Sequence, residues 1–114
     1  MKFKVALHGI IRALRNEIHM KIHVGAAILV CIVGAYFNLS KGEWIGVTIC
    51  IATVFSAEIF NSAIEELCDT LHPEQNKGIG LVKDMAAGAV LIVSIAAAVV
   101  GLIIFVPYLI ELIH

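Results

Sequence analysis

The chain has 114 residues, of which 61% are hydrophobic and 15% are charged, with a formal net charge of −1. This hydrophobic share exceeds the roughly 45–50% that is usual in soluble domains, so we expect a single-domain membrane protein. The near-neutral charge gives no support for nucleic-acid binding. The cysteines stand singly, without Cys-x-x-Cys spacing, which indicates small apolar core residues rather than a redox or metal site.

Residues 1–16 predict an amphipathic helix, because apolar side chains recur at helical spacing and basic side chains occupy the other side. A basic polar face favours a helix that lies in the lipid headgroup layer. The alternative is a solvated helix packed against its own protein. The apolar positions are Phe3, Leu7, Ile10, Ile11, Leu14 and Ile18, and the positions on the other side are Lys2, Lys4, His8, Arg12 and Arg15.

Three long apolar segments follow, at residues 18–39, 43–71 and 81–112, and each predicts a transmembrane helix. The second segment is longer than a span requires, so we expect its C-terminal end to reach the headgroup level or beyond. Three helices bury little surface on their own. Oligomerisation is therefore expected before a site could be enclosed.

Basic residues are distributed unevenly between the loops. Lys2, Lys4, Arg12 and Arg15 precede the first span and Lys21 lies near its start. Lys77 and Lys83 lie in or beside the second loop, whereas the first loop holds only Lys41. By the positive-inside rule, the N-terminus and the loop at residues 72–80 are cytoplasmic. The turn at residues 38–42 and the C-terminus then face outward.

A row of polar residues follows the C-terminal part of the second apolar segment. At about 100° per residue these positions form one stripe on a helix that is otherwise mainly apolar. An ionisable group at membrane depth costs roughly 2.5–3.5 kcal/mol on insertion scales, so such groups usually face a protein interior or a wet cavity. The stripe is therefore the leading candidate for a site. Its members are Glu58, Asn61, Ser62, Glu65 and Asp69.

With this topology, Glu17 and the pair Lys83-Asp84 gather with the stripe at the cytoplasmic interface. Carboxylates, an amide and a lysine suit phosphoryl transfer, which needs oxygen ligands for Mg²⁺, a cation beside the phosphoryl group and a base. The sequence has no Walker-type phosphate loop. From spacing alone a proton-relay or transporter subunit is equally compatible, because intramembrane acids serve both classes.

Each of these residues also has a simpler interpretation. Glu17 could be an interfacial charge beside basic residues, and Lys83-Asp84 could be a helix-start pair, since the helix dipole favours an acid there. His19 and His23 lie one turn apart and could ligate a metal. Histidines are common beside membrane spans, so we leave both out of the predicted site.

Three sequence blocks together resemble a known family: Asn16-Glu17, the run Glu-x-x-Asn-Ser-Ala-Ile-Glu at residues 58–65, and Lys83-Asp84. They are similar, in residues and spacing, to the bacterial membrane-integral diacylglycerol kinases, a family that includes undecaprenol kinase. The resemblance covers nearly the whole chain. It implies an ATP-dependent lipid kinase of the bacterial inner membrane, with an N-terminal surface helix and three transmembrane helices. It also implies a homotrimer with active sites shared between neighbouring subunits at the cytoplasmic face.

The resemblance further implies a role for each matching residue. Glu58 would be the general base that accepts the proton of the lipid hydroxyl. Glu17 and Glu65 would hold Mg²⁺ on the ATP phosphates, and Asn61 would position groups around the transferred phosphoryl.

At the nucleotide end, Lys83 would contact the phosphates and Asp84 would lie beside it on the nucleotide. Asp69 would be structural or close to the nucleotide. The full ATP-binding set implied by the resemblance is Glu17, Glu65, Glu74, Gln75, Asn76, Lys83 and Asp84.

The identity of the lipid rests on the same resemblance. The surface helix is shorter than in the long proteobacterial diacylglycerol kinases, and residues 14–17, 21–23 and 39–44 look more like the undecaprenol kinase branch. We therefore predict undecaprenol as the substrate, with diacylglycerol as the alternative. A remote alternative is a non-enzymatic oligomer that handles ions or protons. The third segment disfavours it, because no ionisable group lies between Met85 and Pro107.

Overall fold

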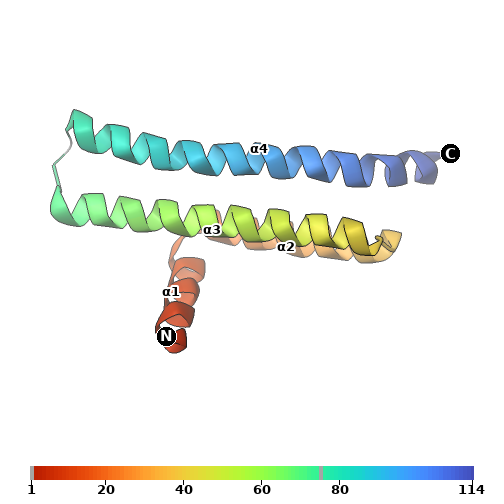
Figure 1. Ribbon diagram of the computed structural model, residues 1–114, viewed down its shortest axis with the longest axis horizontal. Coiled ribbons are helices and arrows are strands. Elements are labelled where there is room, and N and C mark those ends of the chain that lie inside the picture. The colour runs from red at the N-terminus through yellow and green to blue at the C-terminus, as the bar shows by residue number, and fades with distance from the viewer. Residues whose placement is uncertain (1, 75) are drawn as a thin grey trace.

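A computed structural model describes residues 2–74 and 76–114, and this part of the chain is helical apart from short connections. The helices are α1 (Phe3–Asn16), α2 (Ile18–Phe37), α3 (Lys41–Leu71) and α4 (Lys77–Ile113). Figure 1 shows α3 and α4 running antiparallel, with α2 lying along α3. The molecule is elongated, with extents of 57 × 33 × 22 Å.

Helices α2, α3 and α4 are each long and apolar enough to cross a membrane. The all-helical class and the three candidate spans are therefore confirmed. Large apolar side chains stay exposed along all three helices, as at Ile28 (56%), Ile49 (58%) and Leu102 (62%). In lipid such surfaces need no burial, because the acyl chains around them are also apolar.

The bounds of the helices follow from local capping chemistry. The α2 helix ends at Phe37, and the capping residue Asn38 adopts the left-handed conformation (φ 56°, ψ 59°) typical of a helix terminus. Ser40 and Glu43 then form a capping box that starts α3. The α4 helix begins at Lys77, about one turn before the predicted start of the third segment. The reason is that Asn76 accepts a hydrogen bond from the Ile79 N–H (2.9 Å) and so caps the helix there.

The turn between α2 and α3 is packed closely against α4. A Cβ added at Gly34 would lie 2.9 Å from ring and methyl carbons of Trp44 and Leu39, so only glycine fits this approach. The Tyr108 hydroxyl donates a hydrogen bond to the Glu43 carboxylate, and the Tyr108 ring stacks on Phe37 at 5.3 Å. These contacts join all three long helices at one end and fix their register along the whole bundle.

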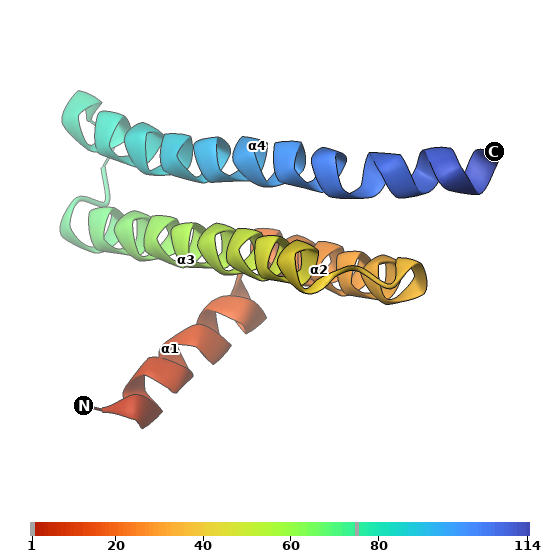
Figure 2. The ribbon, with the colours of Figure 1, turned by 45° about the vertical axis from the view of Figure 1, so that its right-hand side comes forward.

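Helix α1 leaves this bundle at a steep angle in both ribbon views (Figures 1 and 2). The chain bends at Glu17, whose backbone is extended (φ −106°, ψ 124°) and which separates α1 from α2. No residue of α1 is buried. Its apolar side chains, including Phe3 at 69% and Leu7 at 44% exposure, therefore lack a cover within the described chain.

Candidate active site

The most deeply buried acid of the stripe is Glu58, which is 5% exposed although it lies on a long membrane helix. Its Oε2 atom lies 3.4 Å from Nε2 of His23, which projects from α2. The His23 ring also packs edge-on against Phe55, with ring centroids 6.3 Å apart. A buried carboxylate is tolerated when a polar partner offsets its desolvation, and His23 supplies that partner.

One turn further along α3, Asn61 and Glu65 are joined. The Asn61 Nδ2 donates a hydrogen bond to Oε1 of Glu65 at 3.1 Å. Asn61 is 9% exposed, and its Oδ1 atom has no hydrogen-bond partner within the described chain. Buried amide oxygens are rarely left in this state. The arrangement therefore presents an acceptor and a carboxylate that suit a bound cation or hydrogen-bond donor.

The last acid of the stripe connects α3 to α4. The Lys83 Nζ donates to Oδ1 of Asp69, and both side chains are partly exposed. An ion pair in contact with solvent holds its partners weakly, because water screens the charges. Lys83 can therefore exchange Asp69 for another anion at small cost.

Antiparallel packing brings Glu17 toward the same region. Glu17 precedes His23 by six residues, about 9 Å along the helix axis. Because α2 and α3 run in opposite directions and His23 faces Glu58, that displacement leads toward Glu65 on α3. Helix α1 also contacts α3. Glu17 and Glu65 are thus brought to a similar level by helices that are separate in sequence.

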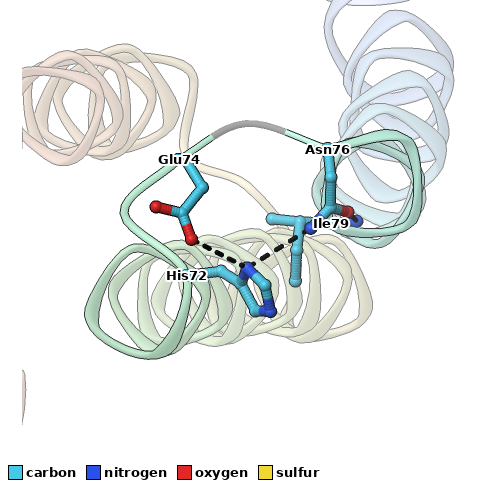
Figure 3. A network of polar contacts seen from close by, with 4 residues as sticks. All are labelled: His72, Glu74, Asn76 and Ile79. Atoms are coloured by element: carbon cyan, nitrogen blue, oxygen red, sulfur yellow. Dashed lines mark hydrogen bonds and ion pairs between the residues drawn. The ribbon is translucent and has the colours of Figure 1, made fainter.

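The loop between α3 and α4 carries a small polar network, drawn in Figure 3. The His72 Nδ1 lies 3.3 Å from Nδ2 of Asn76 and 3.8 Å from Oε1 of Glu74. Glu74, Asn76 and Asp84 are all exposed, at the end of the bundle where Lys83 lies. Gln75, predicted to bind nucleotide, lies outside the described residues.

A groove with a volume of about 320 Å³ opens between α2, α3 and α4. His23 stands at its edge, so the groove adjoins the buried Glu58 carboxylate. Its walls are almost entirely apolar, and several of the side chains are small. The walls include Ala26, Val54, Phe55, Ala97, Ala98 and Gly101.

The oxygen donors of this region fit Mg²⁺. Among residues 2–74 and 76–114 there is no cluster of three or more His, Cys, Asp or Glu that could hold a metal. Mg²⁺ does not need such a cluster, because it usually takes one or two protein carboxylates together with substrate phosphates and water. Glu65 supplies a carboxylate of this kind, and the Oδ1 of Asn61 beside it has no hydrogen-bond partner within the described chain.

One residue of the candidate site, His23, was not predicted from the sequence. His23 was set aside with His19, and its contact with Glu58 emerges only when α2 packs on α3. The short turn between α2 and α3 could have indicated the contact. A short turn makes the two helices antiparallel neighbours, so each position on α2 faces a defined position on α3. Sequence spacing within α2 alone does not reveal the contact.

Comparison with known proteins finds relatives over nearly the whole chain. A family model described as prokaryotic diacylglycerol kinase matches residues 4–105. The undecaprenol kinase of Bacillus subtilis is 36% identical over 110 residues, covering 94% of this chain and 89% of that protein. A diacylglycerol kinase of a Synechocystis species is 30% identical over 116 residues, covering 98% of this chain and 65% of that protein.

These similarities decide between the two classes of function that the acids alone left open. The match extends over almost the whole chain, and both relatives are named as lipid kinases. A family of kinases implies ATP as the co-substrate, and the three apolar helices imply a multi-pass membrane protein. The chain belongs to the prokaryotic diacylglycerol kinase family and is a lipid kinase of the membrane.

Proposed function

We propose that the protein transfers the γ-phosphate of ATP to the hydroxyl of undecaprenol, with Glu58 as the general base. The observation that carries the proposal is the buried Glu58 carboxylate at the edge of an apolar groove. A prenyl chain lying in the groove would bring its terminal hydroxyl to this carboxylate. The higher identity to an undecaprenol kinase than to a diacylglycerol kinase supports the prenyl substrate. Diacylglycerol remains the alternative.

The proposed chemistry is a direct transfer. The lipid hydroxyl gives its proton to Glu58 while its oxygen bonds to the γ-phosphorus, and the bond from that phosphorus to the bridging oxygen of ADP breaks. The protein contributes mainly position and electrostatics to such a reaction. The low exposure of Glu58 keeps water, a competing acceptor, away from the base.

The nucleotide would occupy the part of the stripe nearer the α3–α4 loop. Glu58 and Glu65 are separated by about 10.5 Å along the helix axis, which leaves room for a phosphate chain. Glu17 and Glu65, with Asn61 beside them, would hold Mg²⁺, which neutralises negative charge on phosphate oxygens. Lys83 would leave Asp69 and stabilise charge on the phosphoryl group.

The remaining contacts to ATP would come from residues close to the loop. Asp84 adjoins Lys83 in sequence, and the Glu74–Asn76 segment connects α3 to α4. Both features favour a nucleotide that reaches past Lys83 toward the loop.

We further propose a homotrimer with active sites between protomers, in the bacterial inner membrane. The exposed apolar faces of α2 to α4 and the groove between them support an assembly in which neighbours complete the site. The uncovered apolar side chains of α1 support a helix that lies on the membrane surface. The basic residues favour a cytoplasmic N-terminus and a cytoplasmic active site.

The proposal is tested by the purified protein in detergent with Mg²⁺ and labelled ATP. Transfer of label to undecaprenol and to diacylglycerol is measured side by side, for wild type, Glu58→Gln and the control Glu66→Gln. Because Gln cannot accept the proton, we expect Glu58→Gln to lose activity by a factor of about 10² or more. Glu66 is exposed and lies off the stripe, so its variant should keep wild-type activity.

Preference for diacylglycerol would establish the alternative substrate. A folded wild-type protein that binds ATP and labels neither lipid would contradict the proposed acceptor. Full activity of Glu58→Gln would contradict the general-base role.

A further inference from the structure

We infer that His23 is a positioning residue that orients the general base, an inference that rests on the proposed function. In this role its Nε2–H faces Oε2 of Glu58 and leaves Oε1 directed at the lipid hydroxyl. The two residues then act as a pair in which only Glu58 touches the reacting proton.

The surroundings of the contact support the pairing. The Nε2–Oε2 distance is 3.4 Å, and the two side chains are 25% and 7% exposed. Contacts of this kind are often long before substrate binds and tighten in the productive complex. The edge contact with Phe55 limits the tilt of the ring, so the imidazole already faces the carboxylate.

Within the described chain, no other side chain at this depth can orient the Glu58 carboxylate. Glu58 has no other polar side chain within hydrogen-bond or ion-pair distance there. Helix α4 carries no ionisable residue between Met85 and Pro107, and its one polar side chain on the groove is Ser94. His19 and Lys21, on the same helix as His23, are exposed.

The physical reason for such a partner lies in the carboxylate itself. Its two oxygens are equivalent and the terminal torsion of the side chain is soft, so an unsupported carboxylate samples many orientations. A donor on one oxygen fixes the plane and keeps the other oxygen available. Supporting groups of this kind hold catalytic side chains within the narrow range of useful geometry.

The position of His23 also relates the base to the lipid. The imidazole borders the apolar groove on one side and Glu58 on the other. A chain in the groove would pack against the ring and exclude water from the pair. The same residue would therefore couple occupancy of the groove to the alignment of the base.

The test compares His23→Leu, His23→Gln and His19→Leu, with lipid kinase activity measured over a range of ATP and lipid concentrations. We expect His23→Leu to lower kcat by about 10–100-fold, as is typical when a supporting partner is removed, with KM for ATP within about twofold. His23→Gln places an amide N–H near the position of Nε2 and should retain activity within about fivefold. His19→Leu makes the same change on an exposed face one turn away and should match wild type.

A second measurement asks whether His23 acts through Glu58. If it does, adding His23→Leu to Glu58→Gln should produce no further loss, because the base that His23 orients is already gone. Additive losses would overturn the inference. So would activity of His23→Leu within about twofold of wild type, or equal losses in the Leu and Gln variants.

Folding is checked by gel filtration and by ATP binding for every variant. If His23→Leu does not fold, His23→Asn replaces it. Its shorter amide does not reach Oε2, so we expect low kcat beside an active His23→Gln, and equal activity of the two would overturn the inference. A wild-type protein that labels no lipid would instead refute the proposed function, and the inference with it.

Discussion

The two ends of the helical bundle differ in how completely their polar side chains are paired by hydrogen bonds. At the turn between α2 and α3, Glu43 accepts bonds from Ser40 and Tyr108, and Trp44 packs against a glycine. At the other end, a buried oxygen of Asn61 has no hydrogen-bond partner among residues 2–74 and 76–114, and Lys83 pairs with the exposed acid Asp69.

This difference separates two tasks along the same helices. A closed end with satisfied polar groups sets the register of α2, α3 and α4. The open end then holds the carboxylates and the amide that we propose as ligands of the metal and the nucleotide. Changes at the open end should therefore affect activity, whereas changes at the closed end should affect stability.

The largest effect at the open end, apart from the loss of Glu58, is expected at the proposed metal site. Glu65→Gln removes one carboxylate charge and should lower activity by about 10² at fixed Mg²⁺, with partial recovery as Mg²⁺ is raised. Activity is measured across a Mg²⁺ titration, together with thermal unfolding. Glu111→Gln, an exposed acid near the opposite end of α4, is the matched control and should leave the titration unchanged. A Glu65→Gln enzyme with wild-type Mg²⁺ dependence would argue against this ligand.

An intermediate effect is expected at the closed end. Gly34→Ala places a methyl group against Trp44 and Leu39, and such overpacking destabilises by about 1–3 kcal/mol. Gly25→Ala lies on the same helix with no atom within 4 Å of the added carbon, so it should be neutral or slightly stabilising. Unfolding in detergent is measured for both variants. If the two behaved alike, the close approach at Gly34 would have no role in fixing the register.

The smallest effect is expected in the groove, where a substitution should change KM for the lipid but not KM for ATP. Ala97→Phe narrows the apolar groove and should raise KM for undecaprenol by about tenfold, while KM for ATP stays within about twofold. Ala96→Phe, at the neighbouring exposed position, is the control. Equal KM values for the lipid in the two variants would show that the prenyl chain lies elsewhere.

Much of this protein could be predicted from its sequence, because the relevant signals are local. Apolar length predicts the three long helices, and helical periodicity places Glu58, Asn61, Glu65 and Asp69 on one stripe of α3. The spacing of the motifs also identifies the family. The start of α4 differs from the prediction, because the side chain of Asn76 caps the helix ahead of the glycines.

What the tertiary structure decided is which side chains meet across helices. The contact of His23 with Glu58 and the link from Asp69 to Lys83 both depend on antiparallel register, as does the similar level of Glu17 and Glu65. That register is set at the distant turn by the packing of Trp44 on Gly34 and by the contacts of Tyr108 with Glu43 and Phe37. Periodicity reports the face of a single helix, but it carries no information about the level at which two helices pack. The residues that form the stripe can therefore be predicted from the sequence, whereas the partner of each acid is decided by the packing of the helices.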